Sequence, residues 1–151
     1  MTEHEQNFEF TVTDLMDQMT IDQIKEVLLP PAGRDAIGGS LESLSSDLTV
    51  LFEDRNLKLT GRVLRLLSLV SQLNLETWRC KDRLDDEPES YTETLRHAQD
   101  LNGLRNCARN LLQTDLNEAS PARQRASFFV TEEGLKLRKR IIADMEQISN
   151  S

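Results

Sequence analysis

Apolar residues recur every three or four positions along most of the chain, which is the spacing of amphipathic α-helices. The clearest stripe lies between residues 58 and 85 and consists of Leu59, Val63, Leu66, Val70 and Leu73. A second stripe runs from residue 90 to residue 117. Only a short acidic turn with a proline separates the two. The pattern therefore predicts a long central hairpin of two antiparallel helices, about 58–85 and 90–117.

The segments on either side of this hairpin predict further helices. Apolar positions from residue 13 to residue 28 indicate one or two helices that end at a proline pair, and Thr20 with Gln23 resembles a capping box. Residues 30–40 hold two prolines and three glycines, which predicts a linker. Ser40 is placed to cap a helix that ends near Asn56, and another helix is predicted after residue 130.

No strand–turn–strand series is visible, so the fold class predicted for residues 1–151 is all-α. We expect a single-domain antiparallel bundle of three to five helices, with residues 1–12 as an extended arm. Residues 122–130 are predicted to be a loop or a short wing strand. At 151 residues the chain is long enough for a hydrophobic core of its own.

The composition excludes several classes of protein. The longest apolar-rich stretch, residues 63–75, is interrupted by polar side chains, so no membrane span is predicted. The acidic N-terminus lacks the basic start of a secretory signal, which favours a cytoplasmic protein. The two cysteines, Cys80 and Cys107, have no metal-ligand spacing and are predicted to be reduced thiols.

Charge is unevenly distributed along the chain, whose net charge is −8. Residues 1–54 carry twelve acidic and two basic residues, whereas residues 123–140 carry six basic and two acidic ones. An acidic protein repels nucleic acid and anionic membranes on average. We therefore expect the acidic N-terminal half to attract the basic C-terminal helix, within one chain or between two chains.

The common catalytic and cofactor motifs are absent. The sequence has no phosphate-binding loop, dinucleotide fingerprint, zinc-peptidase motif, serine-hydrolase elbow or calcium loop. His97 is the only histidine inside a predicted helix, and a single helical histidine is more often structural than catalytic. The sequence thus identifies no catalytic residue, no cofactor and no metal site, and it favours a protein that is not an enzyme.

One polar constellation remains on the two helices of the central hairpin. The first helix carries Asn74, Trp78 and Asp82 on one face, and the second carries Asn102, Arg105, Asn106 and Arg109 on one face. The antiparallel register places Asn102 and Arg105 within side-chain reach of Asn74. The favoured interpretation is a buried network that fixes the register, with Arg105 paired to a carboxylate. The alternative is a pocket for a small anion or nucleotide. In it the forked guanidinium of Arg105 would bind the anion and Trp78 would provide a stacking surface.

These residues resemble a family pattern. Asn74, Trp78 and Asp82, followed by Asn102, Arg105 and Asn106, are similar to the two-helix pattern of an uncharacterised bacterial helical family, domain of unknown function 4254. Lys81 stands where that family has an acid. The resemblance covers about residues 74–106. It implies a helical fold with a matched pair of polar helices, and it implies no activity.

A second resemblance concerns the C-terminal part of the chain. Residues 122–141 are similar to the end of winged-helix regulators of the multiple-antibiotic-resistance repressor class, where a basic wing precedes a dimerising helix. This resemblance implies a DNA-binding regulator. The residues that would contact nucleic acid are Arg123, Arg125, Lys136, Arg138, Lys139 and Arg140. A recognition helix rich in base-reading residues is not evident between them and residue 59.

The leading hypothesis is a helical protein that works by binding a partner and that associates with itself, because every predicted helix carries an apolar face. A homodimer is the favoured assembly, and nucleic acid is a possible but not favoured partner. A duplex-binding assay across a salt series distinguishes DNA binding from the leading hypothesis, because phosphate contacts make the affinity depend steeply on salt concentration.

Self-association is testable directly. We expect the protein to run as a dimer or larger oligomer in size-exclusion chromatography with light scattering at micromolar concentration. A strict monomer at that concentration would contradict the prediction.

Overall fold

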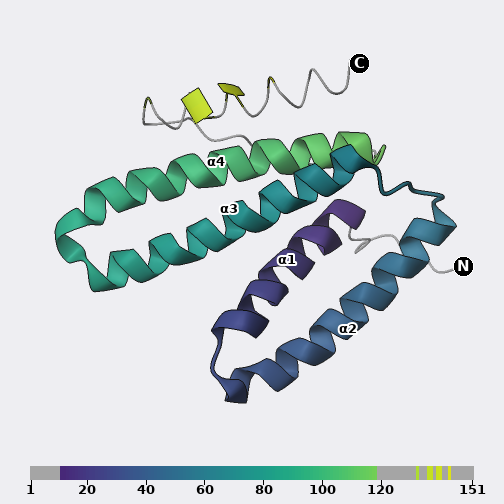
Figure 1. Cartoon of the computed structure of the whole chain (residues 1–151), viewed down its shortest axis with the longest axis horizontal. Helices are drawn as coiled ribbons and strands as arrows, with labels where there is room; N and C mark the ends of the chain where they lie inside the picture. The colour runs from purple at the N-terminus through teal and green to yellow at the C-terminus, as the bar shows by residue number, and fades with distance from the viewer. Residues whose placement is uncertain (1–10, 119–131, 133–135, 138, 141–142, 144–151) are drawn as a thin grey trace, which may run out of the picture.

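The computed structural model describes residues 11–118, 132, 136–137, 139–140 and 143, and its fold is an all-α bundle (Figure 1). Four long helices follow one another: α1 (Val12–Leu28), α2 (Pro31–Asp54), α3 (Gly61–Asp86) and α4 (Tyr91–Asp115), with a 3₁₀ turn, η2 (Pro88–Ser90), before α4. The described residues contain no strand. The predicted fold class is confirmed, and so is the central hairpin.

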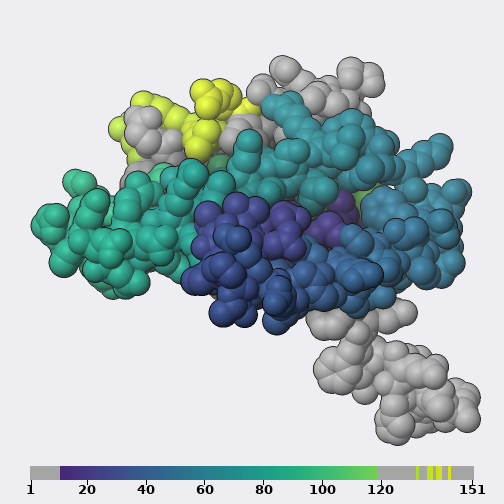
Figure 2. Space-filling view, turned by 60° about the horizontal axis from the view of Figure 1, so that its bottom comes forward, coloured from purple at the N-terminus to yellow at the C-terminus, as the bar shows by residue number. Residues whose placement is uncertain are grey.

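The helices form two hairpins, α1 with α2 and α3 with α4, which pack across each other (Figure 1). Helix α1 contacts all three other long helices, whereas α2 packs mainly on α1. In the space-filling view the α3–α4 turn projects beyond the α1–α2 hairpin (Figure 2). Helix α1 is therefore the element through which the two hairpins are joined.

Local sequence signals set the helix ends. Thr11 and Asp14 form a reciprocal capping box at the start of α1, and the Thr60 hydroxyl accepts a hydrogen bond from the Val63 amide at the start of α3. Helices α2 and α4 each end with an asparagine of positive φ, Asn56 and Asn117. Asparagine tolerates this left-handed conformation, and the amides that follow return to carbonyls of the last helical turn.

The core has two parts. The larger cluster lies where all four helices meet and consists of Val12, Met16, Leu48, Val63, Leu66, Leu112 and Leu116. The smaller one lies farther along the α3–α4 hairpin and consists of Leu73, Cys80, Leu101 and Leu104. Cys80 and Cys107 are both buried and free, as predicted. No described helix is long and apolar enough to cross a membrane.

The predicted linker at residues 30–40 is wrong. These residues, apart from Pro30, form the first turns of α2, and the actual connection is only Leu29 and Pro30. A proline at the first helical position costs no hydrogen bond, because that amide has no partner within the helix. None of the three glycines in this stretch has a positive φ, so none breaks the helix.

Contacts with α1 and its C-terminal end support the helical state of this part of α2. The Arg34 guanidinium returns to the end of α1 and donates hydrogen bonds to the carbonyls of Leu29, at 2.8 Å, and Val27, at 3.3 Å. The Ser40 hydroxyl donates to Asp22 of α1 at 2.8 Å. Ser40 is thus a mid-helix contact to α1 and not the predicted helix cap.

Three further predictions concern the ends of the chain and α1. Thr20 does not start a helix: α1 is continuous, and the Thr20 hydroxyl donates to the Asp17 carbonyl. The predicted arm lies outside the described residues except for Thr11 and Val12, which are the cap and first residue of α1. Residues 122–130 lie outside them as well. The six described residues beyond 118 are helical, and Leu137 packs against the smaller core cluster.

The helical state of residues 31–40 predicts the effect of removing a glycine. A Cβ added at Gly39 meets no atom within 4 Å, so Gly39→Ala should raise the free energy of unfolding by about 0.5–1 kcal/mol. Gly39→Pro should lower it by about 3 kcal/mol, because it removes an interior helical hydrogen bond. Both values are measured by urea unfolding. If neither substitution changed the free energy of unfolding, residues 31–40 would form a linker rather than a helix.

Candidate functional site

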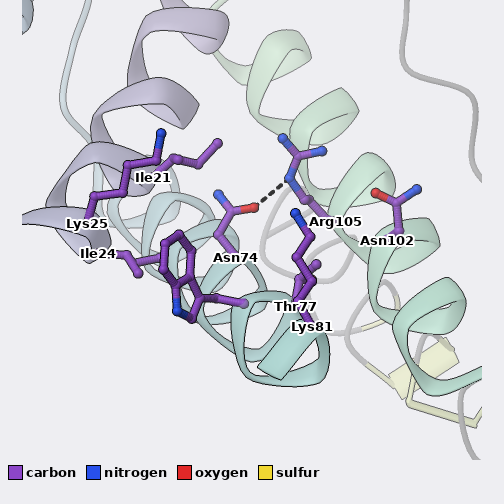
Figure 3. A pocket seen from close by; sticks show the side chains of 9 residues that line it. Ile21, Ile24, Lys25, Asn74, Thr77, Lys81, Asn102 and Arg105 are labelled. Atoms are coloured by element: carbon purple, nitrogen blue, oxygen red, sulfur yellow. Dashed lines mark hydrogen bonds between the residues drawn. The ribbon is translucent and has the colours of Figure 1, made fainter. Parts of the chain in front are cut away.

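A cavity of about 310 Å³ opens between α1, α3 and α4 (Figure 3). Three helices line it with side chains at helical spacing. Helix α1 contributes Ile21, Ile24 and Lys25, helix α3 contributes Asn74, Thr77, Trp78 and Lys81, and helix α4 contributes Asn102 and Arg105. We call this cavity the three-helix pocket.

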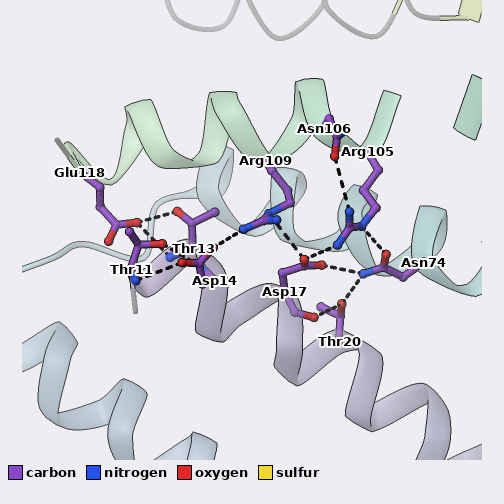
Figure 4. A network of polar contacts seen from close by, with 10 residues as sticks. All are labelled: Thr11, Thr13, Asp14, Asp17, Thr20, Asn74, Arg105, Asn106, Arg109 and Glu118. Carbon is purple, nitrogen blue, oxygen red and sulfur yellow. Dashed lines mark hydrogen bonds and ion pairs between the residues drawn. The ribbon is translucent and has the colours of Figure 1, made fainter. Parts of the chain in front are cut away.

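Arg105 is the residue that connects the three-helix pocket to the polar contacts between the two hairpins. Its Nε donates to the Asn74 Oδ1 at 2.6 Å, and its Nη2 pairs with the Asp17 carboxylate of α1. The Asn74 amide nitrogen in turn donates to Asp17 and to the Thr20 hydroxyl, both at 2.8 Å. One carboxylate of α1 therefore binds α3 and α4 at the same time (Figure 4).

Arg109, one helical turn beyond Arg105, extends this network toward the start of α1. Its Nη2 pairs with Asp14, and its Nε lies 3.5 Å from the Asp17 carboxylate. The side chains of Asp17 and Arg109 are only 7% and 10% exposed, so water screens their charges weakly. We call Asp14, Asp17, Thr20, Asn74, Arg105 and Arg109 the polar junction. Its two carboxylates and two guanidinium groups balance in charge.

Glu118 completes the contacts at the N-terminus of α1. Asn117 turns the chain after α4, and Glu118 then accepts hydrogen bonds from the amides of Val12, at 2.6 Å, and Thr13, at 2.9 Å. The Thr13 hydroxyl also donates to it at 2.6 Å. A carboxylate is favourable at this position because the helix dipole is positive there. Together with the Thr11 capping box, Glu118 satisfies the free amides of the first turn.

The charge around the three-helix pocket is one-sided. Its lining contains three basic residues and no acidic one, in a chain whose net charge is −8. Asp17 neutralises Arg105. Lys25 and Lys81 have no ion pair or hydrogen-bond partner for their ammonium groups within the described part of the chain. Figure 3 shows Lys25 on the α1 side of Asn74, and Lys81 and Arg105 on the other side.

The structure brings together most of the residues that the sequence singled out. Asn74 and Arg105 are directly bonded, and with Trp78 and Asn102 they line the three-helix pocket. Asn106 is buried, and its Oδ1 lies 3.5 Å from the Arg105 Nη1. Asp82 is exposed and has no hydrogen bond or ion pair among the described residues, so the structure separates it from this group.

Sequence reasoning missed the contribution of α1. Asp17 and Thr20 share a face with Ile21, Ile24 and Lys25, because these residues follow one another at helical spacing. An acidic residue on the apolar side of a predicted helix was the available signal for Asp17. Two acids of α1, Asp14 and Asp17, pair with the arginines of α4. The expected attraction between the acidic N-terminal half and the basic C-terminal helix stays a prediction, because much of residues 123–140 lies outside the described residues.

The residues of the nucleic-acid alternative are only partly described. Lys136, Lys139 and Arg140 are helical and exposed, whereas Arg123, Arg125 and Arg138 lie outside the described residues. No group of three or more histidine, cysteine or acidic side chains placed to hold a metal ion occurs in the part of the chain that the structure describes.

Comparisons with known proteins give no further assignment, because the chain matches no family model, no curated protein and no solved structure. The resemblance of residues 74–106 to domain of unknown function 4254 remains a prediction.

The polar junction predicts that Arg105→Ala destabilises the fold. The substitution removes one of the two arginine partners of the buried Asp17 carboxylate, which should cost about 3 kcal/mol and lower the Tm by roughly 6–12 °C. The matched control is Arg79→Ala, whose ion pair with Glu76 is at the surface and whose side chain is 60% exposed. Its effect should stay within about 0.5 kcal/mol. Thermal and urea unfolding of both variants measure the difference, and equal stabilities would contradict a structural role for Arg105.

Proposed function

We propose that this chain is a helical binding protein whose ligand is a small anion held in the three-helix pocket. The observation that carries the proposal is the pair of unneutralised lysines, Lys25 and Lys81, on the wall of one cavity beside Arg105. Acidic residues outnumber basic ones 26 to 18 in the chain, yet none lines this cavity. A cluster of cations without counter-charges repels itself and attracts an anion.

Arg105 is well prepared to take part in binding. The polar junction engages its Nε and Nη2, whereas its Nη1 has, among the described residues, only the 3.5 Å contact with Asn106. The guanidinium is therefore fixed in place before a ligand arrives, which lowers the entropy lost on binding. Arg105 is a member of the polar junction and also lines the three-helix pocket, which supports a part for it in binding.

Two other hypotheses rest on different parts of the molecule. Self-association is compatible with anion binding, and exposed Leu59 and Leu64 at the start of α3 provide apolar surface for it. DNA binding is supported less well, because α3 and α4 are long antiparallel neighbours, whereas the helices of a helix-turn-helix cross at about 90–120°. Both hypotheses remain predictions.

Substitution of the two lysines tests the proposal. Lys25→Met and Lys81→Met should each weaken the binding of inorganic phosphate about fivefold, because each removes a charge-assisted contact, from a partly exposed Lys25 and an exposed Lys81. Binding is measured by isothermal titration calorimetry, with fluorescence of Trp78 as a second signal. Trp78 is the only tryptophan in the chain and lies in the pocket.

The controls separate binding from folding. Lys58→Met removes an exposed lysine between α2 and α3, away from the pocket, and should leave phosphate binding unchanged. The Tm of the lysine variants should stay within about 2 °C of the parent, because neither ammonium group has a partner to lose. Phosphate binding that is absent in the parent, or that survives in the Lys25→Met/Lys81→Met double variant, would overturn the proposal.

A further inference from the structure

We infer that the anion taken by the three-helix pocket carries a planar aromatic ring next to its charged group. This inference rests on the proposed function, because it names the class of anion that the same pocket would hold. It follows from the arrangement of apolar, aromatic and cationic side chains on the three helices.

The wall of the three-helix pocket has an apolar component. Ile21 and Ile24 contribute it from α1, and the Trp78 side chain contributes it from α3. A fully hydrated inorganic anion gains nothing from such surfaces, whereas an organic anion buries its own apolar part against them. The ligand that uses the whole pocket therefore has both an apolar body and a negative charge.

Trp78 indicates that the apolar body is a flat ring. Its side chain is half-buried and lines the pocket, so part of the indole surface faces the cavity. Indole stacks on planar rings through its faces and edges, which is an attraction beyond simple burial of area. An aliphatic body would lose that additional attraction.

The spacing on α3 indicates that ring and charge lie close together in the ligand. Trp78 stands between Asn74, four positions before it, and Lys81, three positions after it. Residues at these separations are neighbours on a helix, with Cβ atoms about 5–6 Å apart. A ligand whose anionic group is attached directly to its ring, or by one or two bonds, can contact Trp78 and Lys81 together.

The volume of the cavity limits the ligand further. At about 310 Å³ it lies at the lower end of the range for small-molecule pockets, which is about 300–1,000 Å³. A ligand with one ring system fits this size, whereas a dinucleotide does not. The class is therefore a small aryl phosphate or aryl carboxylate.

The test compares four probes by isothermal titration calorimetry on the full chain: phenyl phosphate, cyclohexyl phosphate, inorganic phosphate and phenol. Benzoate is added as a fifth probe to distinguish a carboxylate from a phosphate. We expect phenyl phosphate to bind about tenfold more tightly than inorganic phosphate, and several-fold more tightly than cyclohexyl phosphate, which has a ring of the same size that is not planar.

Two variants locate the effect. Trp78→Leu keeps an apolar side chain but removes the stacking surface, so it should abolish the advantage of phenyl phosphate over cyclohexyl phosphate. Lys81→Met should weaken all the anions and leave phenol unaffected. Circular dichroism and the Tm of each variant establish that it is folded before its affinities are compared.

The outcomes distinguish this inference from the proposed function. Inorganic phosphate could bind through Lys25 and Lys81 while phenyl phosphate binds no more tightly than inorganic phosphate or than cyclohexyl phosphate. In that case the inference of an aromatic ring is wrong and the proposed anion site stands. If phenol binds but no anion does, or if no probe binds, the proposed anion site is wrong. The inference of an aromatic ring, which rests on that site, is then wrong as well. If benzoate binds as tightly as phenyl phosphate, the charged group is either kind of oxyanion, and the inference holds.

Discussion

The way the two hairpins cross depends on the neutralisation of one buried carboxylate, that of Asp17. A charge in this position is unfavourable unless it is paired and hydrogen-bonded. Its partners come from the other hairpin, Asn74 from α3 and the arginines 105 and 109 from α4. Apolar surfaces can slide past one another, but these contacts are directional. The polar junction therefore specifies how the two hairpins cross, while the leucine-rich core supplies most of the apolar burial.

The same contacts explain why a pocket exists beside the polar junction. Pairing with Asp17 and Asn74 holds Arg105 toward α1, and the next turns of α1 and α3 place Lys25 and Lys81 around the space alongside it. A structural network and a binding site were alternatives at the level of the sequence. In the structure the network and the three-helix pocket are neighbouring regions that share an arginine and an asparagine, so a change at Arg105 affects both.

Periodicity predicted the α3–α4 hairpin because both helices have long apolar stripes and a proline marks their turn. The pairing of Asn74 with Arg105 followed from that register alone. Residues 30–40 were predicted to be a linker because glycine and proline favour turns and loops locally. In the structure Arg34 and Ser40 stabilise this stretch as a helix through contacts with α1. The packing of α1 against the central hairpin, which brings Asp17 and Lys25 to the site, has no short-range signal. It depends on how two hairpins dock, and helical spacing does not encode that.

The position of Glu118 has a consequence for the order of folding. The amides at the start of α1 are satisfied by a residue more than a hundred positions later in the chain. During synthesis, α1 emerges early but lacks this cap and the arginine partners of Asp14 and Asp17 until α4 is complete. Docking of α1 on α4 therefore closes a loop of more than a hundred residues. Contacts at such a sequence separation carry a large loop-closure entropy and slow the folding of a domain.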